Sequence, residues 1–439
     1  MDIKNIKNVQ ELDRFLDEKI EENRKGSFDL KVLDHLGEPL KDVEVSVEHI
    51  NHDFVFGVCP NGHISMTNEL ACGNGEDSEK YWKLIGDLFN GTTLWWAWEV
   101  LEPVEGKWTF DEKVGKYGPM NRMVERAEKL GHKLTAHAIL YPNTDVTPAW
   151  VQTREPKEAV KYFERHVRST AERYKSRINF WHPVNEAYRP LQTIGNLQVN
   201  EGLVYRWIRE EIPNAGLVDN GGYTINPDFY AKGIRNAKAF ETDVDYLGIR
   251  GYFELYRPDA LDFFKDLWEH FGNLKKLYGK KIRFTELGAS SAKRAAEHKE
   301  DIDVDHTIIA QLGITDIATD ESKIELSEET QAEFLTRMYK LMFAHEAMYE
   351  CTYWDMVDKY TWNEVEGGLV KNDLTPKLAY YKIQELIHKQ WNTKLSLKTD
   401  SDGRCNFKGF YGTYKIKANG KEVSIDFTKD MPSNAAAIY

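Results

Sequence analysis

Short apolar runs alternate with longer amphipathic stretches through most of the chain. Apolar residues recur at helical spacing in five stretches, at 115–130, 157–175, 227–239, 260–278 and 327–345. The apolar runs read as buried strands and lie at 54–59, 89–96, 133–141, 178–186, 215–223, 244–252, 281–289 and 351–358. Eight strands that alternate with helices predict parallel pairing, so we expect an α/β fold, a (β/α)8 TIM barrel over 51–390. An open doubly wound sheet is the alternative, and the lack of an early G-x-G-x-x-G loop disfavours it.

The N-terminal end of the chain has a different pattern. Residues 9–24 carry apolar side chains at helical spacing and predict an amphipathic helix. The runs 28–32 and 43–47 alternate apolar with polar residues on either side of a turn-like LGEPLKD segment. We interpret these two runs as a β-hairpin with one buried face.

The C-terminal tail is strand-like as well. Residues 393–439 contain alternating runs, and the pairs Asp402-Gly403 and Asn419-Gly420 are typical of hairpin turns. We expect a small β-rich accessory domain beside the barrel, in which the extension at 1–50 packs against the segment at 391–439.

Composition and charge narrow the possible partners. The chain has 439 residues, of which 41% are hydrophobic and 29% charged, and this is typical of a soluble globular protein. Its net charge of −13 repels nucleic acids and anionic membranes, so we expect neither as a partner. We expect a cytoplasmic protein as the sequence stands, or a secreted or periplasmic one whose signal peptide has been removed. No pattern in the chain predicts an oligomeric state.

The cysteines do not indicate a metal or a disulfide framework. Cys59, Cys72, Cys351 and Cys405 are scattered, and no C-x-x-C pair occurs. The predicted strand ends also lack a cluster of His and Asp ligands, which disfavours a metal-dependent hydrolase on the same barrel. We therefore expect no metal and no cofactor.

Two glutamates are the first candidates for chemistry. Active sites of TIM barrels lie at the C-terminal ends of the strands. The run 178–186 ends on Asn185 and Glu186, and the run 281–289 carries Glu286. Two carboxylates at one concave site are what glycoside hydrolysis requires, one to protonate the leaving oxygen and one to attack. Structural salt bridges at the barrel mouth are the alternative, since the chain holds 71 Asp and Glu residues.

Six motifs occur in a fixed order along the barrel. They are FVFG at 54–57, W-x-x-x-E-P at 98–103 with GKWTF at 106–110, AH at 136–137, WHPVNEA at 181–187, FTEL at 284–287, and WDMVDKYTW at 354–362 with LTPKLAYY at 374–381. With these motifs the region from about 54 to 388 resembles family 10 of the glycoside hydrolases, the retaining endo-β-1,4-xylanases. The resemblance implies a carbohydrate substrate, a β-linked polysaccharide or oligosaccharide, and cleavage by double displacement.

The resemblance also implies roles for single residues. Glu186 matches the general acid/base and Glu286 the nucleophile, Asn185 would bind the sugar 2-hydroxyl, and His137 would contact the same sugar. Trp354 and Trp362 would form the walls of that subsite. We add five strand-end residues as substrate-binding candidates, namely Trp96, Tyr141, Tyr223, Arg250 and Tyr252. Consecutive tryptophans cannot all face one side of a strand, so we expect one or two of Trp95, Trp96 and Trp98 in the core.

The chain departs from the family pattern around the sugar. Ala97 stands where the family carries a Lys, Arg250-Gly251-Tyr252 replaces Gln-x-His, Gly288 replaces an Asp, and Tyr141-Pro142 replaces Trp-His. We hypothesise that Arg250 either supports Glu286 or binds a carboxylate on an acidic sugar. A degenerate barrel that binds carbohydrate or protein without cleavage is the alternative function. The long charged segment at 287–326 follows the seventh strand, where long loops are often functional.

Overall fold

The computed structural model describes residues 2–60, 68–112, 119–141, 146–186, 200–222, 227–253, 256–292, 325–358, 361, 365–429 and 435–439. Two predicted site residues, Tyr223 and Trp362, lie outside these ranges. So does most of the charged segment that we expected at 287–326.

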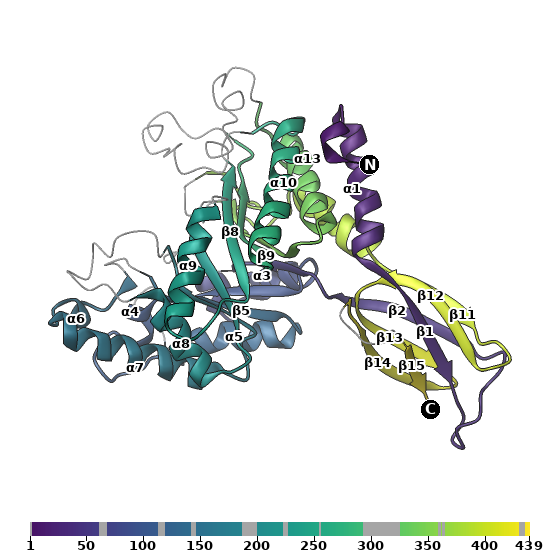
Figure 1. Ribbon diagram of the computed structural model, residues 1–439, viewed down its shortest axis with the longest axis horizontal. Coiled ribbons are helices and arrows are strands. Elements are labelled where there is room, and N and C mark those ends of the chain that lie inside the picture. The colour runs from purple at the N-terminus through teal and green to yellow at the C-terminus, as the bar shows by residue number, and fades with distance from the viewer. Residues whose placement is uncertain are drawn as a thin grey trace.

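Eight parallel strands close into a barrel (Figure 1), in the order β10-β3-β4-β5-β6-β7-β8-β9. Their bounds are β3 (Val55–Val58), β4 (Gly91–Trp95), β5 (Lys133–Leu140), β6 (Phe180–Val184), β7 (Gly216–Gly222), β8 (Tyr246–Phe253), β9 (Lys281–Ala289) and β10 (Met348–Tyr353). Each strand overlaps one predicted apolar run, and the predicted (β/α)8 barrel is confirmed.

Helices alternate with the strands and cover the outside of the barrel (Figure 1). The described helices of this region are α2 (Asn68–Cys72), α3 (Glu76–Gly86), α4 (Trp98–Leu101), α5 (Met120–Lys129), α6 (Ala149–Gln152), α7 (Pro156–Tyr174), α8 (Glu201–Glu211), α9 (Pro227–Ala239), α10 (Leu261–Tyr278), α13 (Glu328–Ala344) and α14 (Leu378–Glu385), which continues as a π-helical turn, Leu386–Gln390. Their starts follow local chemistry: Pro156 occupies the first turn of α7, and Ser327 and Thr330 form a capping box before α13. Their apolar faces join one continuous core with the strands.

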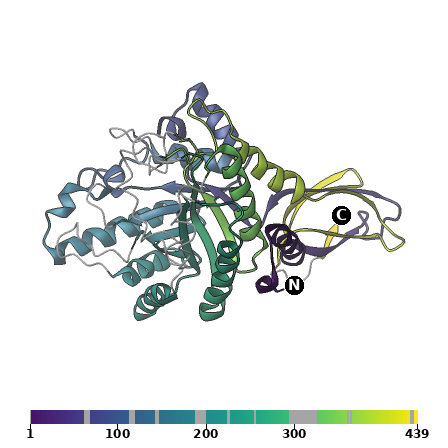
Figure 2. The ribbon, with the colours of Figure 1, turned by 90° about the horizontal axis from the view of Figure 1, so that it is seen from above.

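The two chain ends form a β-sandwich beside the barrel (Figures 1 and 2). One sheet has the order β12-β1-β15 and the other β11-β2-β13-β14. The strands are β1 (Lys25–Val32), β2 (Glu44–His52), β11 (Lys394–Lys398), β12 (Arg404–Phe410), β13 (Gly412–Ala418), β14 (Lys421–Phe427) and β15 (Ala435–Ile438). The expected β-rich accessory part made by both chain ends is confirmed.

The predicted hairpin between 28–32 and 43–47 is wrong. β1 pairs with β12 and β15, whereas β2 pairs with β11 and β13, so the two strands belong to opposite sheets. Their apolar faces meet across a shared core that includes Phe28, Val45 and Phe427. The alternation correctly marked which side chains are buried, but it did not determine the pairing partner.

The N-terminal helix belongs to the packing of the barrel. α1 (Val9–Asn23) lies beside α13 (Figure 1), and Phe15 packs edge-on against Trp268 of α10 with ring centroids 5.0 Å apart. At the junction with β1, the Arg24 guanidinium donates to the carbonyl oxygens of His345 at 2.7 Å and Met348 at 2.8 Å. It thereby satisfies carbonyl groups that follow the C-terminus of α13. The domain boundaries near 50 and 390 stay predictions.

Candidate active site

Parallel strands of a closed barrel bring their C-terminal ends to one mouth, and the two predicted catalytic carboxyls lie there. Glu186 follows β6, Glu286 lies near the end of β9, and β8 places Arg250 opposite Glu286 in register. These three residues are 3%, 4% and 2% exposed. Burial of charged groups is costly unless they are paired, so their contacts define the site.

Both side-chain oxygens of Glu186 accept hydrogen bonds. Tyr141 donates its hydroxyl to Oε2 at 3.0 Å, and Arg250 donates from Nη1 to Oε1 at 2.9 Å. The backbone of Glu186 has φ of 52°, a left-handed conformation that is uncommon for residues other than glycine. Strained backbone of this kind clusters at functional sites, where the surrounding structure enforces it.

Glu286 is held from several sides. Tyr252 donates its hydroxyl to Oε2 at 2.6 Å, and Asn220 donates from Nδ2 to Oε1 at 3.3 Å. The same Oε1 lies 3.7 Å from Arg250 Nη1 and 3.8 Å from His137 Nε2. Burial raises the pKa of Glu286, while Arg250 and the two hydrogen-bond donors act in the opposite direction. The carboxyl of Glu286 is therefore buried but surrounded by groups that favour its anion.

Asn220 links the two strand ends and was missing from our candidates. Its Nδ2 also donates to Asn185 Oδ1 at 3.0 Å, and its Oδ1 accepts from the Thr285 hydroxyl at 2.6 Å. Gly248 leaves room for it, because a Cβ at that position would lie 2.7 Å from Asn220 Oδ1. The signal in the sequence was a polar pair, Asp219-Asn220, inside an otherwise apolar run.

His137 is a neutral donor or acceptor at the base of the site. It is 2% exposed, and its Nδ1 lies 2.8 Å from Nδ1 of His182, a second residue that we did not predict. Burial lowers the pKa of His137 to about 3, and the nearby Arg250 adds to the effect. The His137 ring meets Trp354 edge-on, with centroids 5.0 Å apart.

Trp354 and Trp95 form an aromatic wall with the site tyrosines. The cluster that contains them consists of Cys59, Trp95, Ala97, Val100, Val146 and Trp354, packed against Tyr141 and Tyr252. Gly288 is required here, since a Cβ would lie 2.8 Å from both Trp354 O and Tyr252 Cδ1. The tyrosine ring thus occupies space that a side chain at position 288 would need.

Trp96 lies elsewhere, which corrects our expectation that it binds substrate. It is 2% exposed and packs against Tyr174 of α7 and Trp181 of β6, with centroids 4.7 and 6.1 Å away. Trp98 is also in the core, stacked on His166. Side chains alternate along a strand, so Trp95 and Trp96 face opposite sides. Of the three tryptophans, Trp95 is the one at the site.

Residues 71–386 match the model of Glycosyl hydrolase family 10. The chain belongs to this family. The predicted resemblance is thereby confirmed.

Two curated relatives are similar to this chain. The chain is 23% identical over 410 residues to anti-sigma-I factor RsgI6 of Acetivibrio thermocellus, covering 91% of this chain and 45% of that protein. It is 22% identical over 311 residues to endo-1,4-beta-xylanase A of Caldicellulosiruptor sp., covering 65% of this chain and 40% of the relative. The chain thus spans less than half the length of these two relatives.

Two solved structures share the fold. Xylanase 10B from Thermotoga petrophila, in complex with xylobiose, superposes with a TM-score of 0.56 at 19% identity, covering 77% of this chain and 95% of that one. Native xylanase 10B from Thermotoga maritima has a TM-score of 0.56 at 20% identity, covering 77% and 96%.

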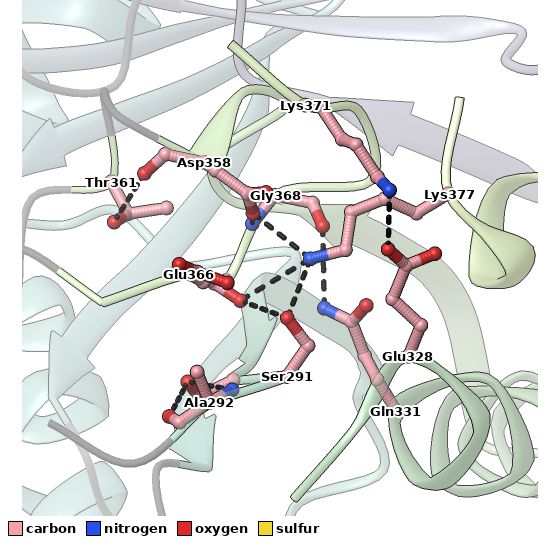
Figure 3. A network of polar contacts seen from close by, with 12 residues as sticks. Ser291, Ala292, Glu328, Gln331, Asp358, Thr361, Glu366, Gly368, Lys371 and Lys377 are labelled. Atoms are coloured by element: carbon pink, nitrogen blue, oxygen red, sulfur yellow. Dashed lines mark hydrogen bonds and ion pairs between the residues drawn. The ribbon is translucent and has the colours of Figure 1, made fainter. Parts of the chain in front are cut away.

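A buried lysine of the family 10 motif at 374–381 holds the segments that follow β9 and β10 (Figure 3). Lys377 is 1% exposed and donates from Nζ to Asp358 Oδ1 at 2.9 Å and to Ser291 Oγ at 2.7 Å. Asp358 Oδ1 also accepts from the backbone N–H of Gly368 at 2.8 Å. Burial raises the pKa of Asp358, and Lys377 counteracts this. The network fixes the strand ends that carry Glu286 and Trp354.

Two kinds of feature are absent from the described ranges. Among those residues, no group of three or more His, Cys, Asp or Glu side chains is placed to hold a metal ion. Within the same part of the chain, no helix combines the length and the apolar character needed to cross a membrane.

Proposed function

We propose that this family 10 chain is a retaining β-glycoside hydrolase that cleaves a β-linked polysaccharide or oligosaccharide by double displacement. The observation that carries the proposal is the shared contact of Glu186 and Glu286 with one atom, Arg250 Nη1, at 2.9 and 3.7 Å. Their two Oε1 atoms can be no further apart than the sum of these distances. This bound includes the retaining separation of about 5–5.5 Å and reaches only the lower edge of the inverting range of about 6.5–9.5 Å, so it favours the retaining geometry.

In the proposed reaction Glu286 attacks the anomeric carbon and Glu186 protonates the leaving oxygen. Glu186 then accepts a proton from the water that hydrolyses the glycosyl-enzyme. Glu186 must release one of its two hydrogen bonds to face the substrate oxygen. The Tyr141 hydroxyl is the partner that can rotate away, because Arg250 is held at the same time by Glu286.

The surrounding side chains fit this assignment. Tyr252 and Asn220 aim the Glu286 carboxylate, and Asn185 lies beside it through Asn220. We propose that Asn185 binds the sugar 2-hydroxyl and that His137 and Trp354 contact the same sugar. Two roles were predicted for Arg250. Its contacts with both carboxyls favour support of the catalytic pair over binding of an acidic substituent.

A binding module without turnover is the second candidate. The observation that favours it is the occupation of both Glu186 oxygens by Tyr141 and Arg250, which blocks proton donation as long as both bonds persist. A relative at 23% identity carries the name of an anti-sigma factor. The opposing observation is that both carboxyls and their hydrogen-bond donors are in place.

Covalent labelling separates the two candidates. An activated 2-deoxy-2-fluoro glycoside, such as the dinitrophenyl xylobioside, should add one glycosyl group to the chain, seen by intact mass, because only a working nucleophile reacts. The peptide with Glu286 should carry the label, and Glu286→Gln should stay unlabelled. Glu186→Ala should still take up the label, since a good leaving group needs no acid. If neither this reagent nor a panel of equivalent hexose and pentose reagents labels the native chain, cleavage by double displacement is refuted.

A further inference from the structure

Two histidines contact each other inside the barrel mouth. His137 of β5 and His182 of β6 are paired in register, and their Nδ1 atoms lie 2.8 Å apart. They are 2% and 0% exposed. Burial lowers the pKa of His137 to about 3 and that of His182 well below its ordinary value, so both rings are neutral at neutral pH.

A hydrogen bond between two neutral Nδ1 atoms uses a single proton, and the remaining nitrogens follow from its location. If His182 Nδ1 donates, His137 carries its own proton on Nε2, and His182 Nε2 is a lone pair. If His137 Nδ1 donates, His137 Nε2 is a lone pair, and His182 carries a proton on Nε2. The surroundings of the two Nε2 atoms decide between these arrangements.

The surroundings of both Nε2 atoms favour the arrangement in which His182 Nδ1 donates to His137 Nδ1. His137 Nε2 lies 3.8 Å from Oε1 of Glu286, so an N–H there meets a carboxylate, whereas a lone pair there would be repelled by it. His182 Nε2 has no hydrogen-bond partner in the described part of the chain. A buried N–H without an acceptor is rarer and more costly than a buried lone pair without a donor.

We propose that His182 is a positioning residue, which fixes the tautomer of His137 by donating to its Nδ1. His137 thereby presents an N–H at Nε2 and acts toward Glu286 and the sugar only as a donor. A substrate atom that faces His137 must then be an acceptor. The tautomer does not depend on the proposed hydrolysis, while its effect on turnover does.

Nitrogen NMR tests the tautomer directly. The native chain is labelled with ¹⁵N-histidine, and the signals lost in His137→Gln and His182→Gln identify the two rings. At pH 7 we expect a protonated Nε2 and an unprotonated Nδ1 for His137, with the opposite pattern for His182. A proton on Nδ1 of His137, or a doubly protonated His137 ring, would overturn the proposal.

Substitutions at position 182 test causation. His182→Asp replaces the donor by an acceptor and should move the His137 proton to Nδ1 or charge the ring. His182→Leu removes the partner, so His137 should populate both tautomers and kcat should fall about tenfold, the effect of one lost hydrogen bond. His182→Asn, whose amide N–H can replace Nδ1–H, should restore both readouts.

The matched control is His166→Leu. His166 is also buried, at 1% exposed, but its Nε2 contacts the carbonyl of Ile139 and it lies in the core beside Trp98. This variant should be destabilised without a change in the His137 signals. Unchanged His137 signals in both His182→Asp and His182→Leu would refute the positioning role. Absence of turnover in the native chain would contradict the proposed hydrolysis and leave the tautomer measurement intact.

Discussion

Replacement of Arg250 by Gln should shift the pH dependence of turnover toward higher pH. Glu286 must be an anion to attack. Burial raises the pKa of its carboxyl, and the Arg250 cation offsets part of that increase. Arg250→Gln removes the cation and leaves the burial unchanged. The pKa of Glu286 therefore rises further, and the acidic limb of the kcat/KM profile moves up with it, because that limb reports the free enzyme.

The distance between the charges sets the size of the shift. Arg250 Nη1 lies 3.7 Å from Glu286 Oε1. At an effective dielectric constant of about 20, unit charges about 4 Å apart interact with about 4 kcal/mol, equivalent to about three pKa units. Rearrangement around the new side chain compensates for part of the lost interaction energy. We therefore expect the acidic limb of the kcat/KM profile to shift by about one to three pH units. At a pH below the new limb, kcat/KM should fall about tenfold per pH unit.

The assay is kcat/KM for an aryl β-glycoside between pH 4 and 9. The matched control is Arg283→Gln, since Arg283 is 0% exposed, lies on the same strand as Glu286 and pairs with Glu350. It should lose stability without moving the acidic limb. An acidic limb that stays in place in Arg250→Gln, or moves to lower pH, would show that Arg250 does not govern the ionisation of Glu286.

Three further variants probe other contacts. Tyr252→Phe removes the hydroxyl that donates to Glu286 at 2.6 Å. It should lower kcat/KM about tenfold at neutral pH and shift the acidic limb to higher pH. An unchanged pH profile would show that this hydrogen bond does not support the Glu286 anion. Burial raises the pKa of Asp219 to about 8, above its unfolded value, so the native chain should lose stability as pH rises from about 4 to about 8. Asp219→Asn should therefore gain in Tm relative to the native chain over that interval, and a constant difference would refute the burial argument. Lys377→Met leaves the partly buried Asp358 without its cation and should cost about 3–5 kcal/mol in urea denaturation, whereas a loss under 1 kcal/mol would show the network to be dispensable.

The barrel could be predicted because its strands are buried on both faces. β5, β6 and β9 are buried over almost their whole length, and such buried runs between amphipathic helices have few other interpretations. The carboxyls at 186 and 286 could be predicted for the same reason, since a charged residue at the end of such a run is conspicuous. The pairing of β1 and β2 could not, because alternation defines a buried face and carries no information about a partner.

The misplaced and missing site residues have a common physical cause. Trp95 is the last residue of β4 and Trp96 follows it, and a shift of one residue moves a side chain from the barrel mouth to the outer core. Asn220 and His182 carry no charge and gain their roles from atoms on neighbouring strands, at 3.3 Å from Glu286 and 2.8 Å from His137. Only the register of the closed barrel brings these atoms together, and a single sequence does not specify the register.

The β-sandwich can be completed only late in synthesis, because its strands come from both ends of the chain. β1 and β2 do not pair with each other. The first partner of β2, β11, begins at residue 394, about 340 residues after β2 ends, and the first partner of β1, β12, begins at residue 404. At a translation rate of about 5–20 residues per second, the two strands wait for roughly 20–70 seconds after they leave the ribosome. Unpaired strand edges are templates for aggregation. A ribosome-associated chaperone that covers residues 25–52 during this interval should therefore raise the yield of native chain, and a slower translation rate should lower it.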